Sequence, residues 1–321
     1  MIVLWRITTT CNLACGFCAY DRRLRIPRAR MDPIEVERLG ALLGAYRSAS
    51  GEEVHLSWLG GEPMLWPSIL PLSRRLREQH GLRMSVTTNG TTLGRPGVVQ
   101  DILSSFDEVT VSVDALAPTH ERLRHWRGGW SQLAEGIRRL ADSRAPRPAL
   151  RLRANVVLMR DTLPEFAELC DRLADWGIDE ITFNQLGGRD RPEFQPDQAL
   201  RAHDVRMLRA LIPELVARMA TRNVRLNAHD AYLERLEATA NGRSIAVEDC
   251  EPRRPTIFID EHGRIASCSF TLDGHGISTR AVRTVDDVAS LRTRLAERRR
   301  AAPAAICADC PSTQVFAKFG T

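Results

Sequence analysis

The stretch Cys11-Asn12-Leu13-Ala14-Cys15-Gly16-Phe17-Cys18 places three cysteines in a C-x3-C-x2-C pattern, directly after the strand-like run Ile2–Thr8. Three thiolates this close in sequence can hold one metal centre but leave its fourth position empty. On a four-iron four-sulfur (4Fe–4S) cluster, that arrangement leaves one iron open to an outside ligand. A structural zinc site would need four ligands, and no histidine lies nearby. The loop therefore predicts an iron–sulfur cluster at the end of the first strand.

The first 185 residues alternate between short β-branched runs and segments with helical periodicity. This alternation is typical of a parallel sheet with helices outside it. Six such units are too few for the usual eight-stranded barrel, so we expect an α/β fold, a partial (β/α)6 barrel of the TIM type. The predicted strands are Ile2–Thr8, Val54–Leu59, Arg83–Thr88, Glu108–Val113, Leu150–Leu158 and Glu180–Asn184, and the predicted helices are Pro33–Tyr46, Ser68–Gln79, Arg95–Ser105, Trp130–Asp142 and Pro164–Trp176.

Short polar motifs stand at or just after the ends of the predicted strands. Residues at the carboxyl ends of barrel strands face the mouth of the barrel, where active sites are built. A Gly-Gly pair alone is no more than a turn signal, so the position of each motif carries the argument. The motifs are Gly60-Gly61-Glu62-Pro63, Thr87-Thr88-Asn89-Gly90, Ser112-Val113-Asp114 and His120-Glu121-Arg122-Leu123-Arg124, with Asn155 on the fifth strand.

Together, the cysteine loop and these motifs resemble the radical S-adenosylmethionine (SAM) superfamily over residues 1–186. In that family the open iron binds the amino and carboxylate groups of SAM, and one electron cleaves SAM to methionine and a 5′-deoxyadenosyl radical. The resemblance implies that Cys11, Cys15 and Cys18 hold the cluster. It also implies a set of SAM-binding residues, which comprises Gly60, Gly61, Glu62, Pro63, Asn89, Ser112, Asp114, Arg124 and Asn155.

Two of these assignments leave a structural alternative open. By its place in the H-[DE]-x-x-R motif, Arg124 would pair with the SAM carboxylate, which suits a guanidinium group. It would equally be a surface residue in so arginine-rich a chain. Asn155, like Asn184 and Gln185 on the next strand, would either point at the site or cap the end of its strand.

Four further cysteines form a second pattern, C-x12-G-x4-C and then C-x2-C; they are Cys250, Cys268, Cys307 and Cys310. Gly263 is expected to turn a hairpin, Ile257–Asp260 and Arg264–Cys268, that returns a cysteine to the metal. Zinc and an iron–sulfur cluster both suit such ligands. The pattern resembles the SPASM extension of radical SAM enzymes in its shortened twitch form, because position 316, where SPASM proteins have a further cysteine, is Phe316. The resemblance implies one fully ligated auxiliary 4Fe–4S cluster that relays electrons.

Cys170 stands apart from both patterns. It falls on the predicted helix Pro164–Trp176 within an apolar stripe that includes Leu169 and Leu173. A free cysteine in such a stripe is expected to pack in the core. The alternative is a thiol hydrogen donor, as in some radical SAM epimerases, but an outer helix is a poor place for one.

The composition excludes several classes of protein. With 43% hydrophobic and 26% charged residues, the chain of 321 residues is ordinary for a soluble globular protein. Of its 45 basic residues 44 are arginine, but 40 acidic residues are interspersed and only 6% are aromatic, so we expect no nucleic-acid partner. No run approaches the roughly 20 apolar residues of a membrane span, and the N-terminus does not resemble a secretory signal. We expect a cytoplasmic protein that does not bind a membrane.

The expected organisation has three parts. Residues 1–186 form the radical SAM core, 187–245 a helical linker region, and 246–321 a twitch-like auxiliary cluster domain. The linker region begins with the polar segment Gly187–Pro196. The long helix Asp197–Thr221 follows, with Pro213 as a kink or break.

We therefore expect an enzyme that abstracts hydrogen from a substrate C–H bond. Its cofactors would be SAM and two 4Fe–4S clusters, with an electron donor such as flavodoxin or ferredoxin. The favoured reaction is oxidation of a small molecule of the sugar or aminocyclitol type, similar to that of twitch-type aminocyclitol dehydrogenases. The alternative is cross-linking or epimerisation of a ribosomally made peptide, which is less favoured because no peptide-recognition domain precedes Cys11. A non-enzymatic iron–sulfur or zinc protein is disfavoured by the motifs at successive strand ends.

Overall fold

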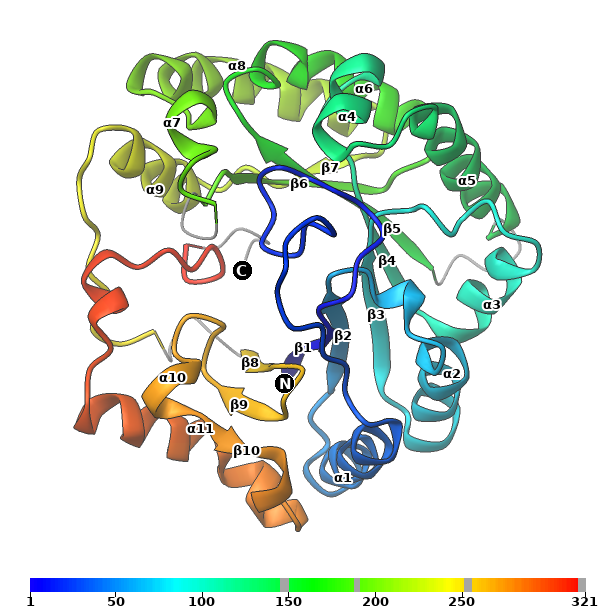
Figure 1. The fold of residues 1–321 in the computed structure, drawn as a ribbon, viewed down its shortest axis with the longest axis vertical. Helices are drawn as coiled ribbons and strands as arrows, with labels where there is room; N and C mark the ends of the chain where they lie inside the picture. Colours follow the sequence, from blue (N-terminus) through cyan, green and yellow to red (C-terminus); the bar gives the residue numbers. More distant parts are fainter. Residues whose placement is uncertain (145–149, 188–190, 251–255, 317–321) are drawn as a thin grey trace.

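The fold is built on one sheet whose first six strands lie parallel and in sequence order (Figure 1). The computed structural model describes residues 1–144, 150–187, 191–250 and 256–316. The α/β class and the parallel order of the six predicted strands are confirmed. These strands are β1 (Ile2–Thr8), β2 (His55–Gly60), β3 (Arg83–Thr88), β4 (Glu108–Ser112), β5 (Arg151–Leu158) and β6 (Glu180–Gln185).

The two faces of the sheet follow from the alternation of side chains along each strand. On β1, Val3, Trp5 and Ile7 are fully buried, and the indole of Trp5 packs 5.6 Å from that of Trp58 on β2. Trp58 donates from Nε1 to Ser73 on the helix outside, at 2.7 Å, so this face of the strands lies under the helices. The intervening residues face the hollow side, where the loop after β1 runs (Figure 1).

Helices surround the sheet on its outer side (Figure 1). Asp32 caps the first of them by accepting from the Ile34 amide at 3.0 Å, and Gly51 ends it in the left-handed conformation. The helices of eight or more residues are α1 (Pro33–Ser50), α2 (Ile69–His80), α3 (Val98–Ser105), α4 (Ala117–Arg124), α5 (Gly129–Ser143), α6 (Phe166–Asp175), α8 (Ala202–Thr221), α9 (Asp230–Ala240) and α11 (Val285–Ala301). Shorter turns are α7 (Gln195–Gln198), α10 (Leu272–His275), and the 3-10 helices η1 (Pro63–Leu65), η2 (Leu163–Glu165), η4 (Thr279–Ala281) and η5 (Ala305–Asp309).

Two helices differ from the sequence prediction. Helix α4 was not expected, because its mostly polar sequence buries only His120, Leu123 and Arg124. Helix α8 contains Pro213 but is not broken there, since its buried side chains continue on both sides of the proline, from Leu208 to Leu215 and beyond. Within the described ranges, no helix is long and apolar enough to cross a membrane.

Both edges of the parallel sheet carry strands that sequence patterns did not assign to it. Strand β7 (Arg225–Leu226) pairs parallel with β6. Strand β8 (Thr256–Ile259) pairs parallel with β1, and β9 (Arg264–Ala266) and β10 (Ile277–Ser278) extend that edge in the antiparallel direction. The predicted hairpin is therefore present, with Gly263 in the left-handed conformation, but it continues the core sheet. The predicted boundary at residue 246 is therefore not a boundary of the sheet, because strands from both sides of it pair with one another.

Candidate active site

The first cysteine loop lies in the middle of the ring of strands and helices, after the carboxyl end of β1 (Figure 1). Its backbone turns back on itself: the Cys18 amide donates to the Cys15 carbonyl at 3.1 Å. The Leu13 amide donates to Cys11 Sγ at 3.5 Å, and the Tyr20 amide to Cys18 Sγ at 3.4 Å. Amide donors therefore already face two of the three sulfur atoms.

The three thiols of this loop lie close enough to influence one another. Burial raises the pKa of Cys15 to about 12; Arg124 opposes this rise, and the Cys18 and Cys11 thiols add to it. Cys15 is buried, while Cys11 and Cys18 are partly exposed. Because thiolates, not thiols, bind metal, binding would have to displace these protons. The donor set fits a cluster with three cysteine ligands.

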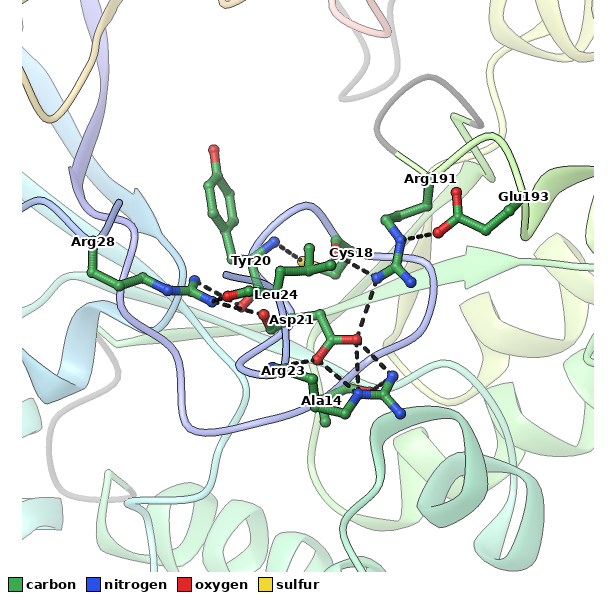
Figure 2. Close-up of polar contacts among 9 residues, drawn as sticks. All are labelled: Ala14, Cys18, Tyr20, Asp21, Arg23, Leu24, Arg28, Arg191 and Glu193. Atoms are coloured by element: carbon green, nitrogen blue, oxygen red, sulfur yellow. Dashed lines mark hydrogen bonds and ion pairs between the residues drawn. The ribbon is translucent and has the colours of Figure 1, made fainter. Parts of the chain in front are cut away.

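Asp21, three residues after Cys18, connects the cysteine loop to two arginines (Figure 2). Its carboxylate, 1% exposed, accepts from Arg23 Nε at 3.0 Å and from Arg191 Nη1 at 3.2 Å. Although burial raises the pKa of Asp21, the bonds from Arg23 and Arg191 outweigh it and hold the pKa at about 2. Arg191 comes from the predicted linker, part of which lies outside the described residues. Arg191 also donates to the Cys18 carbonyl at 3.5 Å. The linker region is therefore hydrogen-bonded to the cysteine loop.

A third arginine, Arg28, holds the same loop through backbone oxygens (Figure 2). Arg28 donates to the carbonyls of Thr9 at 2.8 Å and Asp21 at 2.7 Å, and to those of Tyr20 and Leu24 at 3.2 Å. The guanidinium fork suits this task because it presents several donors in one plane. Sequence analysis did not single out this role, because all the arginines of the segment look alike in sequence.

Gly60 and Gly61 are required by close backbone contact with the cysteine loop. A Cβ on Gly60 would lie 2.5 Å from the Thr8 carbonyl oxygen, and one on Gly61 would lie 2.4 Å from that of Thr10. The Gly61 and Glu62 amides donate to the same two oxygens, each at 2.8 Å. The absence of side chains at Gly60 and Gly61 thus allows the backbone at the end of β2 to pack directly against the backbone of the loop that follows β1.

Glu62 is fully buried, and its carboxylate accepts hydrogen bonds from three neighbouring groups. It accepts from Thr88 Oγ1 at 2.7 Å, from the Asn89 amide at 2.6 Å and from the Met64 amide at 3.0 Å. Pro63, which follows it, begins η1. Burial raises the pKa of Glu62, and the bonds from Asn89 and Thr88 oppose that rise. The carboxylate therefore holds the ends of β2 and β3 together.

Asn89 joins β3 to the cysteine loop. Its Nδ2 donates to Asn12 Oδ1 at 3.0 Å and lies 3.8 Å from Cys11 Sγ. Asn12 in turn donates to Thr91 at 2.9 Å. Asn12 and Thr91 were not predicted, and the only signal for them was their place within or beside a motif.

Asp114 and Arg124 form a buried ion pair beside the first cysteines. Arg124 Nε donates to Asp114 Oδ2 at 2.8 Å, and the other carboxylate oxygen accepts from the Val157 amide at 3.0 Å. Burial lowers the pKa of Arg124, but Asp114 and the Cys15 thiol outweigh this and raise it. His120, also buried, accepts from the Asp114 amide. Arg124 is therefore no surface residue, and its charge lies near the thiols.

Ser112 and Asn155 lie opposite one another on β4 and β5. Asn155 Oδ1 accepts from Thr182 Oγ1 and from Asn184 Nδ2, both at 3.1 Å. The site residues at the ends of β2 to β5 therefore share one rim of the sheet, and polar groups from β6 extend it.

The second cysteines come together from three segments of the chain. Burial raises the pKa of Cys310, the Ser312 amide opposes it, and the thiols of Cys268, Cys307 and Cys250 add to it. The segment before Cys250 is tied to the C-x2-C loop, because the Val247 amide donates to the Cys307 carbonyl, and the Cys310 amide to that of Ile245, both at 2.9 Å. The thiols of Cys268, Cys307 and Cys250 therefore lie near enough to Cys310 to influence its pKa.

A buried arginine from α9 fixes the C-x2-C loop. Arg235 donates from Nη1 to Asp309, which stands between the two cysteines of that loop. Asp309 also accepts from the Ile245 amide at 3.1 Å, so one carboxylate connects α9, the loop and the segment before Cys250.

The spacing of the donors bears on the type of metal centre. Among the described residues, no three or more His, Cys, Asp or Glu side chains are gathered as a single metal ion requires. In a 4Fe–4S cluster each cysteine binds a different iron, so more widely spaced thiols are expected. Cys170 is fully buried on α6, where burial raises its pKa, in keeping with a packing role.

Curated proteins resemble this chain along part of its length. The chain is 28% identical over 226 residues to the pre-heme d1 synthase of Dinoroseobacter shibae, which covers 65% of this chain and 51% of that protein. It is 27% identical over 160 residues to the GTP 3′,8-cyclase of Rhizobium leguminosarum, which covers 48% and 42%. The chain thus spans about half the length of these curated relatives or less.

Solved structures share the fold over the whole chain. Streptococcus suis SuiB bound to S-adenosylmethionine has a TM-score of 0.68, at 17% sequence identity, covering 100% of this chain and 72% of SuiB. The family model of the radical SAM superfamily matches residues 5–173, which include the first cysteine loop and every motif from Gly60 to Asn155. The chain therefore belongs to the radical SAM superfamily, whose members are enzymes that use SAM and a 4Fe–4S cluster.

Proposed function

We propose that the chain is a twitch-type radical SAM oxidoreductase with an auxiliary 4Fe–4S cluster on Cys250, Cys268, Cys307 and Cys310. The convergence of these four buried or half-buried thiols carries the proposal. Four protein ligands would leave no iron of this cluster open to substrate, so it would exchange electrons only. Loss of a hydrogen atom, then of one electron and one proton, is a two-electron oxidation of the substrate.

The chain's own residues would hold and orient SAM. When bound, the first cluster and SAM supply a 5′-deoxyadenosyl radical that removes a hydrogen atom from the substrate. Cys11, Cys15 and Cys18 would hold that cluster, and the positive charge of Arg124 would offset the negative charge of the thiolates. The polar ends of β2 to β5, which carry the predicted SAM-binding residues, would bind the rest of SAM at the rim.

The favoured substrate is a small molecule of the sugar or aminocyclitol type. By its name, the GTP 3′,8-cyclase relative acts on a small molecule, a nucleotide. The second candidate is a ribosomally made peptide, because SuiB, which shares the fold with a TM-score of 0.67, has been solved with the precursor peptide SuiA. Incubation with deuterated aminocyclitols or sugars would separate the two, since only a true substrate transfers deuterium to 5′-deoxyadenosine.

Iron content tests the auxiliary cluster. Anaerobically reconstituted protein is expected to hold about eight irons per chain, as two 4Fe–4S clusters require. The Cys310→Ala variant should fall toward about four, and the Cys170→Ala variant should match the wild type because Cys170 lies outside both sets. About four irons in the wild-type protein would refute the auxiliary cluster, and bound zinc would explain the second cysteines instead.

Reductive cleavage of SAM tests the first cluster separately. The Cys15→Ala variant should form no 5′-deoxyadenosine with dithionite as the reductant, because the cluster that binds SAM would lack a ligand. Cys170→Ala is again the matched control and should keep wild-type cleavage. Cleavage that survives in Cys15→Ala would contradict the assignment of the first cluster.

A further inference from the structure

Arg299 occupies a core position of α11 beside the second cysteines. The inner face of this helix is formed by Val288, Leu291 and Leu295, each at most 2% exposed, and Arg299 continues the same stripe at 5%. The neighbouring Arg300 is exposed. Burial of a guanidinium, which stays charged at any pH that proteins tolerate, is costly unless the charge has partners.

The partners of Arg299 include a cysteine of the second set. Its Nη1 donates to Cys250 Sγ, and its Nη2 donates to Asp249 Oδ1 at 2.7 Å. Asp249 is 55% exposed, so water weakens the compensation that this carboxylate offers. The Cys250 sulfur therefore faces a buried cation at hydrogen-bond distance.

We propose that Arg299 raises the reduction potential of the auxiliary cluster through this contact with Cys250. The inference rests on the auxiliary cluster of the proposed function. Hydrogen bonds to ligand sulfurs and the local charge are main determinants of such potentials. One-electron reduction adds one negative charge and forms no bond, so a buried cation at the sulfur stabilises the reduced state. A higher potential favours electron flow from a substrate radical to the cluster.

The test is a redox titration of the whole protein with both clusters, followed by electron paramagnetic resonance. Addition of SAM perturbs the signal of the SAM-binding cluster, so the signal that SAM leaves unchanged reports the auxiliary cluster. Arg299→Met keeps the volume but removes charge and donors, and is expected to shift the midpoint of this signal to a lower potential. Arg299→Lys keeps the positive charge but lacks the planar guanidinium group with its several donors, and should shift the midpoint potential less. Arg300→Met, on the exposed side of α11, should leave it unchanged.

The outcomes separate this inference from the proposed function. Equal midpoints in Arg299→Met and Arg300→Met, with about eight irons in each, would overturn the role of Arg299 but leave the auxiliary cluster standing. Loss of the second cluster in both Arg299 variants, but not in Arg300→Met, would assign Arg299 to holding the fold and would also overturn it. A wild-type protein without the second signal would instead refute the auxiliary cluster itself.

Discussion

Glu62 shows what a motif can and cannot reveal about a single side chain. The sequence places this residue correctly at the end of β2, beside the cysteine loop. It does not reveal that the Glu62 carboxylate accepts hydrogen bonds from neighbouring protein groups, at Met64, Thr88 and Asn89. A motif names the residue types at a strand end but not the hydrogen-bond partners of each side chain. The cysteine patterns predict convergence more directly, because several thiolates must meet to bind one metal centre.

Replacement of Glu62 by Gln tests this structural role. The amide keeps the size of the side chain but offers an NH2 group to three donors, so at least one buried donor loses its acceptor. We expect a loss of about 1–3 kcal/mol in the free energy of unfolding, measured by urea denaturation. Glu37→Gln, on the exposed part of α1 where Glu37 pairs with Arg75, is the control and should change it by less than about 0.5 kcal/mol. Equal effects in the two variants would contradict the role of Glu62.

Cys170 gives a second prediction for a single residue. Because it is fully buried on α6 and separate from both cysteine sets, Cys170→Ala should retain substrate conversion along with SAM cleavage. Product analysis by mass spectrometry is the measurement. Retained cleavage with loss of product would instead identify Cys170 as a hydrogen donor to the substrate radical.

At the scale of elements, long periodic segments were predicted well and short ones were not. Strands β1 and β3 match their predicted bounds. Strand β7 has only two residues and was not predicted, because its pairing with β6 depends on a partner far away in sequence. Helix α11 is rich in arginine, and its inner face was not predicted. The helical spacing of Val288, Leu291 and Leu295 is the signal that could have placed Arg299 on that face.

Strand β2 carries a histidine whose protonation opposes folding. Burial lowers the pKa of His55 to about 4, and the charges of Arg83 and Arg153 add to this. Its value in the unfolded chain is about 6.5. Between these values the unfolded chain binds a proton that the folded chain does not, so stability is present above pH about 6.5 and is lost as the pH falls toward 4.

The His55→Gln variant should remove this pH dependence. The difference in unfolding free energy between wild type and variant is expected to shrink or reverse on acidification, by at most about 1.4 kcal/mol per pH unit in this window. Urea denaturation at intervals from pH 7 to pH 5 measures it, with His203→Gln, whose side chain is 63% exposed, as the control. A difference that is constant with pH would refute the assignment.

At the scale of the whole molecule, the main surprise is the parallel pairing of β8 with β1. Sequence patterns predicted the hairpin but not its partner, because pairing across some 250 residues leaves no local signal. The predicted parts 1–186 and 246–321 therefore share one sheet. We expect them to unfold together.

Tryptophan fluorescence can test this coupling, since all six tryptophans lie within residues 1–186. Ile257 on β8 is 1% exposed, and Ile257→Ala should cost about 2–5 kcal/mol. If the sheet unfolds as one unit, the fluorescence transition will move to lower urea although no tryptophan is near the substitution in sequence. Ile34→Ala, at a site 77% exposed, is the control. An unchanged transition in Ile257→Ala would indicate that the C-terminal part unfolds independently.

The pairing of β8 with β1 also sets an order of events during synthesis. Strand β1 and the first cysteine loop leave the ribosome long before β8, which begins more than 240 residues after β1 ends. Until then one edge of β1 stays open, and an open strand edge invites pairing with other chains. A nascent chain released early would thus expose both an aggregation-prone edge and three oxidisable thiols. Slower elongation between β6 and β8 should lower the soluble yield more than the same delay after β8.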